Sequence, residues 1–289
     1  MASAAPSLRC RQIEEADLES VASLLAQGFP TRNRQFWLGA FAELRRHAVP
    51  PGLPRYGYML DSNGRAVGAV LLICTLVRAD GGDAPRCNLS SWYVDPAFRA
   101  FAPMLVSRAL RPKDVTFINV SPARHTWPIL EAQGFSRICD GAFFAVPLLN
   151  GWFGGAKITV LDGRQKPQVC FDPRDQETLS AHAAHGCITF WCATAERAYP
   201  FVFRRRFVRG FVPYAQLIYC SDVTDFVRCA GPLGRALARR GLPFVMIDAS
   251  APIPDLAGWY SPGMPKYFKG PQRPRLGDIA YTEYGVLGV

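Results

Sequence analysis

The chain has 289 residues, of which 49% are hydrophobic and 19% are charged. This composition supports one large folded domain or two smaller ones, and it excludes a wholly disordered chain. The sequence holds 33 lysines and arginines against 23 aspartates and glutamates, for a formal net charge of +10. Such a balance favours an anionic ligand, whether a phosphorylated cofactor, an RNA or an acidic lipid surface.

Several features of the chain indicate a cytoplasmic protein. The longest uncharged apolar run, Val67 to Val77, has eleven residues, and a membrane-spanning helix needs about 20. Residues 1–9 lack the basic and apolar regions of a secretory signal. The nine cysteines are odd in number and form no C-x-x-C pair, which predicts reduced thiols. Only four histidines occur, and their spacing to the cysteines predicts that no metal is bound.

The first half of the chain alternates predicted strands and helices. Leu18, Val21 and Leu25 recur on one face of a helix that Gly28 ends. The turn 61–64 contains Asn-Gly, which predicts a hairpin between two strands. The predicted strands span residues 8–13, 56–60, 66–77, 87–94, 115–120 and 138–148, and the predicted helices span residues 14–27, 34–46, 103–110 and 124–133.

The second half repeats this order. The predicted strands span residues 157–161, 187–192, 199–208, 214–220, 243–248 and 278–287, and the predicted helices span residues 176–185 and 232–240. The proline-rich stretch 252–274 predicts a long loop. Because Gly151, Gly154 and Gly155 loosen the chain between the halves, we expect two domains, of residues 1–150 and 151–289.

Five motifs follow one another in the first half: LRCRQIEEADLESVASLL, DSNGRAVGAVLL, SSWYVDPAFR, VTFINVSP and ILEAQGF. In this order they resemble the GCN5-related N-acetyltransferase (GNAT) superfamily. They are similar to its first strand and helix, its central hairpin, its fourth strand with the acyl-CoA pyrophosphate loop, its fifth strand, and the end of the following helix. The resemblance covers residues 8–148.

Residues 214–248 resemble a distant copy of the same strand, loop, helix and strand. The resemblance therefore implies a mixed α/β fold of two GNAT-like domains in tandem. Each would be a mostly antiparallel sheet, flanked by helices, with splayed central strands. In this second copy Arg228-x-x-Gly231 matches the start of the family's phosphate-loop pattern. The same residues are equally typical of an ordinary helix beginning, with Pro232 in its first turn.

In the family, two splayed strands bind the pantetheine arm of the donor, and a loop of backbone N–H groups holds the pyrophosphate. The resemblance places this acyl-CoA site at Trp92, Tyr93, Val94, Arg99, Ala100, Ala102, Met104 and Leu105. Two residues of the loop depart from the family pattern. Met104 stands where the family has a small residue, and Pro103 removes one N–H donor. The anion-binding loop of this half is therefore degraded.

Candidate catalytic residues are few. Leu130 occupies the place of the tyrosine that many family members use as a general acid. His125 is one remaining candidate, because a histidine titrates near neutral pH. Glu283, between Tyr281 and Tyr284 on a predicted strand, is the other, as a general base. Both residues are equally typical of exposed positions without a catalytic role.

The leading interpretation is an acyl-CoA-dependent N-acyltransferase. It would transfer an acyl group, acetyl in the first place, to an amine or hydroxyl of a small-molecule or glycan acceptor. A second hypothesis is a Fem-type transferase that uses aminoacyl-tRNA. The run FVFRRRFVRGF, with arginines from Arg204 to Arg209, would then contact RNA, although an edge strand with one charged face has the same pattern. A non-catalytic scaffold is the third hypothesis, and the degraded loop favours it.

Overall fold

The computed structural model describes residues 8–79, 82–150, 158–208 and 210–288. Contacts divide the chain into two compact units. The first consists of Met1–His125, Ala132–Gly134 and Phe268–Arg273, and the second of Thr126–Glu131, Phe135–Tyr267 and Pro274–Val289. Gly151, Gly154 and Gly155, which predicted the division at residue 150, lie outside the described residues, as does Arg209.

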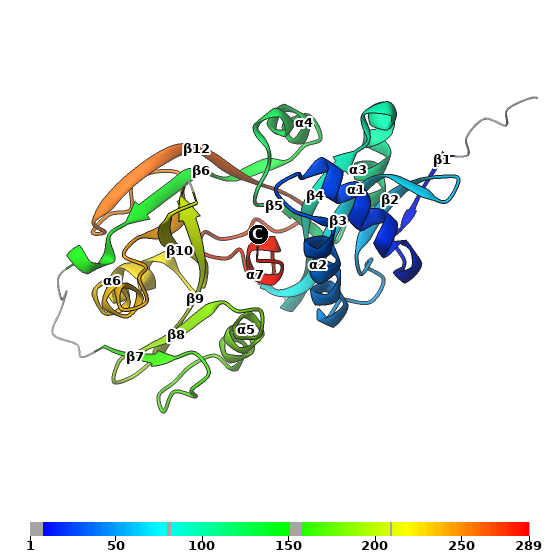
Figure 1. Cartoon of the computed structure of the whole chain (residues 1–289). Helices are drawn as coiled ribbons and strands as arrows, with labels where there is room; N and C mark the ends of the chain where they lie inside the picture. Colours follow the sequence, from blue (N-terminus) through cyan, green and yellow to red (C-terminus); the bar gives the residue numbers. More distant parts are fainter. Residues whose placement is uncertain (1–7, 80–81, 151–157, 209, 289) are drawn as a thin grey trace, which may run out of the picture. The chain divides into compact units, whose positions relative to one another are not determined.

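The first unit is built on five neighbouring strands (Figure 1). In chain order they are β1 (Leu8–Gln12), β2 (Gly57–Ser62), β3 (Arg65–Ala79), β4 (Gly82–Val94) and β5 (Thr116–Asn119). The pairs are antiparallel from β1 to β4, and β4 pairs with β5 in parallel. The helices of this unit are α1 (Leu18–Gly28), α2 (Arg34–Arg46) and α3 (Ala102–Ala109).

Local sequence explains much of this unit. The predicted hairpin at residues 61–64 is confirmed, with Asn63 and Gly64 at positive φ. The buried Asp61 carboxylate accepts the N–H of Gly64 at 2.7 Å and Arg11 Nε at 2.8 Å. Helix α1 buries Val21 and Leu25, as its periodicity predicted. The Asp61 side chain thus fixes the turn and ties it to β1.

Two of the cysteines are not free thiols. Cys74 on β3 and Cys87 on β4 lie directly opposite each other, with Cα atoms 4.0 Å apart, and form a disulfide. The expectation of reduced cysteines throughout is therefore wrong for this pair. The reason is the strand register, which brings the two residues together and which spacing along the chain does not reveal.

The second unit has its own series of strands (Figure 1). They are β6 (Ser136–Ala145), β7 (Thr159–Asp162), β8 (Ile188–Ala193), β9 (Ala198–Val208), β10 (Val212–Cys220), β11 (Val245–Ala249) and most of β12 (Gly258–Lys269), in the spatial order β12-β6-β11-β10-β9-β8-β7. Strands β10 and β11 are parallel. The helices are α4 (Trp127–Ala132), whose last residue belongs to the first unit, α5 (Pro173–Ala184), α6 (Val223–Ala238) and α7 (Glu283–Val286).

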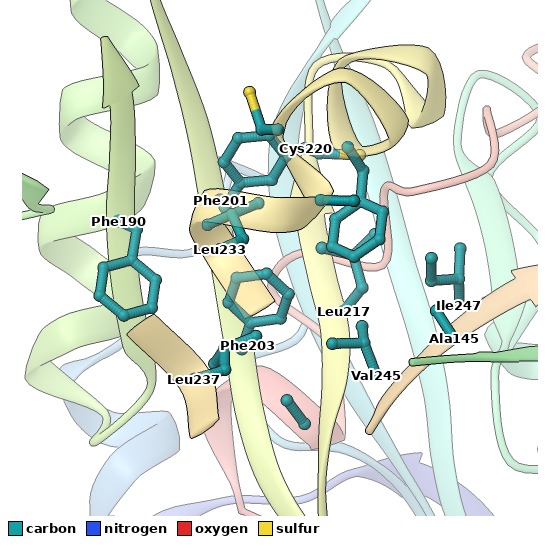
Figure 2. Close-up of a cluster of buried hydrophobic side chains, with 14 of the residues drawn as sticks. Ala145, Phe190, Phe201, Phe203, Leu217, Cys220, Leu233, Leu237, Val245 and Ile247 are labelled. Carbon is teal, nitrogen blue, oxygen red and sulfur yellow. The ribbon is translucent and has the colours of Figure 1, made fainter. Parts of the chain in front are cut away.

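Helix α6 covers the core of this unit. Figure 2 shows Leu233 and Leu237 of α6 beside Phe201 and Phe203 of β9, and all four side chains are fully buried. Each large apolar side chain buried in this way contributes about 1.5–3 kcal/mol. The core therefore fixes α6 against the strands from β8 to β11.

Three parts of the second unit differ from expectation. Strand β12 crosses the predicted loop despite Pro262 and Pro265, which lack the N–H that a strand normally donates. Helix α6 begins at Val223 rather than at Pro232, capped by the Asp222 side chain. Residues 278–287, predicted as a strand, form one isolated bridge and the short helix α7. Strand β6 also packs in the second unit, so that unit begins before residue 150.

Candidate functional site

Strand β5 is much shorter than β4, so the parallel pairing of the first unit covers only part of β4. Its pairing runs from Arg86 opposite Thr116 to Asn88 opposite Ile118 and ends there, while β4 continues to Val94. In the described part of the first unit, residues 89–94 of β4 pair with β3 alone. Beyond Asn88, the edge of β4 on the side of β5 therefore has no strand partner among the described residues.

A bulge interrupts β4 beyond its pairing with β5. Ala69 lies opposite Tyr93 and Leu71 opposite Ser90, so that two residues of β4 face Val70 alone. Ser91 has a φ of 53°, a left-handed conformation that a side chain rarely adopts. A bulge of this kind bends its strand and increases the local twist. Residue 91 is a serine, not a glycine, so no local pattern signals the bulge.

Two of the three predicted donor residues on β4, Tyr93 and Val94, pack their side chains against neighbouring elements. The Tyr93 ring lies against α1, where a Cβ at Gly28 would be 2.3 Å from its Cγ atom. Val94 is buried against Gly68 of β3. Trp92 is half-buried. These three residues can therefore offer a ligand their backbone groups, while two of the side chains hold β4 in place.

The predicted phosphate loop is a compact turn. Residues Pro96–Phe101 form a 3₁₀ helix, η2, that leads directly into α3. Within it, the Asp95 side chain accepts the Ala97 N–H, and the Ala102 N–H donates to the Arg99 carbonyl. Pro103 lies in the first turn of α3 and has no N–H. The N–H groups of Ala97 and Ala102 are therefore bonded within the turn, whereas an open anion-binding loop would present such groups to a ligand.

The side chains of this turn divide into two groups. Arg99, Ala100 and Met104 are exposed, Met104 by 39%, whereas Leu105 is fully buried and belongs to the core. Ala102 lies between these extremes. Arg99 is thus the one cation among the predicted donor residues.

The second unit contains a matching parallel pair, β10–β11. Its pairing joins Ala215 to Val245 and Gln216 to Met246 and stops there, although both strands continue. Here the chain's own C-terminal segment, residues 277–286, begins with three residues, 277–279, that bond the edge of β10 beyond its pairing with β11. The Cys220 N–H donates to the Gly277 carbonyl at 2.9 Å, and the Ile279 N–H donates to the Ile218 carbonyl at 3.0 Å.

Further contacts hold the C-terminal segment. The Tyr281 N–H lies 3.0 Å from Nε2 of His182, whose Nδ1 lies 2.8 Å from the Thr178 carbonyl. The ring is fully buried, and these partners require the neutral tautomer with its proton on Nδ1. Gly277 has a φ of 80°, and a Cβ there would lie 2.6 Å from Cys220 Sγ. Only glycine fits this position.

The two predicted catalytic residues lie in different units. His125 is exposed in the 3₁₀ helix η3 (Arg124–Thr126) and belongs to the first unit. Glu283 belongs to the second and is the first residue of α7, with 1% of its surface exposed. It is therefore a buried helical residue and not a residue of a strand. The catalytic roles of both residues stay predictions.

The second predicted anion site is the interior of a helix. Arg228 and Gly231 lie within α6, and Arg228 donates to the Tyr199 hydroxyl at 2.7 Å. A Cβ at Gly234 would lie 2.7 Å from the backbone of the 3₁₀ helix η4 (Pro147–Leu149). The glycine therefore permits close packing. The sequence signal for the true start of α6 is Asp222, which was missed. Its side chain caps the helix by accepting the Thr224 N–H at 2.7 Å.

The arginine-rich strand is β9. Phe201 and Phe203 are fully buried, and Arg204 donates to the His185 carbonyl at 2.7 Å. Arg206 lies over the Tyr284 ring, 4.8 Å from its centroid. Phe207 remains exposed. RNA contact through this strand stays a prediction.

Comparison with known proteins identifies the fold. No protein-family model and no curated protein sequence matches the chain significantly. Solved structures do match. A GCN5-related N-acetyltransferase from Anabaena variabilis has a TM-score of 0.59 at 8% identity, over 91% of this chain and 72% of that one. Another from Kribbella flavida has a TM-score of 0.56 at 15% identity, over 91% and 71% of the two chains.

A putative acetyltransferase from Pyrococcus horikoshii matches with a TM-score of 0.53 at 12% identity, over 95% of this chain and 93% of that one. The chain therefore has the fold of the GCN5-related N-acetyltransferase superfamily, as its five motifs predicted. Within the described ranges, no helix is both long enough and apolar enough to cross a membrane.

Proposed function

We propose that the protein is an acyltransferase that takes its acyl group from acyl-CoA, bound in the first unit where β4 and β5 separate. The observation that carries this proposal is the contrast between the two parallel pairs. Beyond Asn88, β4 keeps a backbone edge without a strand partner in the described part of its unit, whereas the corresponding edge of β10 is bonded to residues 277–279. An amide-bearing chain such as pantetheine suits the open edge, because each of its amides both donates and accepts.

The chemistry follows from this placement. The acceptor's amine attacks the thioester carbonyl carbon, a C–N bond forms, and the C–S bond then breaks. The departing CoA sulfur takes up the proton that the amine loses. A backbone N–H of residues 89–93 would stabilise the oxyanion, because its position is fixed before the reaction. His125 is our candidate for moving the proton, and Glu283 is the alternative.

Arg99 is the residue that would bind the donor's phosphates. It is exposed in η2, directly ahead of α3, and a guanidinium forms strong paired hydrogen bonds with phosphate. We propose a small-molecule or glycan acceptor, which stands on the family resemblance alone.

Isothermal titration with acetyl-CoA and a longer acyl-CoA tests the donor. We expect Arg99→Glu to weaken binding about tenfold, or ~1.4 kcal/mol, through the loss of a phosphate contact. Arg111→Glu is the matched control, because Arg111 is exposed beyond the end of α3. Binding that is equal in both variants would move the donor away from η2. An absence of binding to the native chain would contradict the proposal.

The second candidate, a donor carried on tRNA, is favoured by the exposed Arg205 and Phe207 of β9. It predicts tRNA binding that weakens steeply with salt. A transferase that uses acyl-CoA is indifferent to tRNA, so the same preparation separates the two functions. A scaffold protein would bind neither donor.

A further inference from the structure

A groove with a volume of about 420 Å³ lies in the second unit, between strand β7 and helix α6. One wall consists of five consecutive residues, 158–162. The opposite wall is formed by Pro232, Arg235, Ala236 and Arg239, with Arg240 just beyond the helix, and the Phe190 ring of β8 also lines it. Neither the phosphate-loop motif nor the predicted donor residues are part of it.

The charge of the groove is one-sided. Three arginines, Arg235, Arg239 and Arg240, line it together with one carboxylate, Asp162. That carboxylate already accepts the backbone N–H of Arg164 at 3.0 Å. The guanidinium of Arg240 is held over the Phe190 ring, 4.6 Å from its centroid, and donates to the Ala236 carbonyl. An anionic partner therefore meets at least one cation that is fixed in advance.

The shape of the groove favours an extended chain over a compact anion. The four residues of β7 span about 10 Å, and the helical wall from Pro232 to Arg239 also spans about 10 Å. Among the described residues, strand β7 pairs with β8 alone and ends the strand order of its unit. An edge strand presents backbone N–H and C=O groups that another strand can bond.

We propose that this groove binds an acidic peptide segment of a partner protein as an added strand beside β7. The partner's backbone would bond the edge of β7, and its carboxylates would pair with Arg235, Arg239 and Arg240. The peptide's alternate side chains would point to the opposite face of the added strand, away from α6. This proposal does not depend on the donor or on the transfer reaction.

Fluorescence anisotropy with a labelled hexapeptide, in which glutamate alternates with valine, tests the proposal. Arg239→Glu and the milder Arg239→Gln are the variants, and Arg174→Glu is the control, because Arg174 is exposed on α5 outside the groove. We expect saturable binding to the native chain and to the control. In Arg239→Glu the affinity should fall at least tenfold, and in Arg239→Gln by a smaller factor.

Two further peptides separate the parts of the argument. A peptide with glutamine in place of glutamate should bind at least tenfold more weakly, because it lacks the charges. A glutamate peptide methylated on alternate backbone nitrogens should also lose affinity, because it lacks strand donors. Equal binding of the glutamate and glutamine peptides, or of the native chain and Arg239→Glu, overturns the proposal. Full affinity of the methylated peptide overturns the added strand.

Discussion

The two parallel strand pairs show how one arrangement of backbone can have two outcomes. In both units a strand leads through a helix to a parallel neighbour, and in both the pairing stops after two or three residues. In the second unit residues 277–279 then bond the exposed edge of β10. In the first unit the described residues leave the edge of β4 open toward β5.

The difference has a simple physical cause. Backbone N–H and C=O groups that leave a ladder need other partners, because burying them without one costs about 1–3 kcal/mol each. A chain segment can supply those partners permanently, as residues 277–279 do. A ligand or water can supply them reversibly. Only a reversible partner leaves room for a donor, and the proposal that acyl-CoA binds in the first unit depends on this difference.

The largest expected effect concerns β11 beyond its ladder with β10. Asp248 there accepts a hydrogen bond from Lys266 of β12 at 2.6 Å, and both side chains are almost fully buried. Burial alone lowers the pKa of Lys266, but the neighbouring carboxylate raises it overall. We expect Lys266→Met to cost about 3–5 kcal/mol, because an unpaired carboxylate stays buried.

Urea unfolding measures that loss. The double variant Lys266→Met with Asp248→Leu should recover most of the stability, since it removes both charges. A double variant as unstable as the single one would show that packing, rather than charge, holds β11 in the second unit.

The next effect tests the C-terminal segment itself. Gly277→Ala combines a positive φ with a clash against Cys220 Sγ, so we expect a loss of about 3 kcal/mol. Gly210→Ala is the matched control. Gly210 has a φ of 83° with nothing within 4 Å of its Cβ position, and its substitution should cost about 1 kcal/mol. Equal losses by urea unfolding would mean that the clash contributes nothing and that the segment is loosely held.

The two units should also respond to acid with opposite sign. In the first unit burial raises the pKa of Asp61, but Arg11, the Gly64 N–H and Arg9 lower it overall. Its stabilisation is therefore complete above the unfolded value, about 3.8, and is lost as the pH falls through the lower folded value. In the second unit burial raises the pKa of Asp175, against its hydrogen bond from Tyr219. The stability linked to that group is complete below about 3.8 and is lost as the pH rises through the folded value.

Fluorotryptophan resonances can follow the units separately, because Trp37 is buried in the first and Trp191 in the second. Between neutral pH and about pH 4, Asp61→Asn should reduce the stability reported by Trp37 by about 1–2 kcal/mol. Asp175→Asn should flatten the acid response reported by Trp191. Identical pH profiles at the two probes would contradict the difference in sign.

The smallest effect concerns the donor loop. Met104 is exposed, so Met104→Ala should change the stability by no more than about 0.5 kcal/mol. If acyl-CoA binds beside η2, the smaller side chain should tighten binding by about threefold, because bulk near the phosphates is removed. Titration of the same variant with Pro103→Ala added should strengthen the effect. No change in affinity would place the donor away from this turn.

Sequence patterns predicted the parts of the protein that depend on nearby residues. The hairpin at residues 61–64, the helices 14–27 and 34–46 and the five ordered motifs needed only turn chemistry, periodicity and chain order. They were sufficient to indicate the GNAT fold, which the structure and its solved neighbours confirm. The candidate donor residues lie on β4, in η2 and at the start of α3, and their role stays a prediction; the bulge at Ser91 was not visible in the sequence.

What the tertiary structure decided depends on partners far apart in the chain. A glycine is needed at position 277 because Cys220 lies against it in the folded protein. The disulfide of Cys74 forms because strand register places Cys74 opposite Cys87. Strand β12 forms despite its prolines because it is hydrogen-bonded to its neighbours in the strand order. By itself the sequence determined the class of fold and the order of its elements. That another segment bonds the edge of β10 was decided by residues 277–279, whose hydrogen bonds no local pattern encodes.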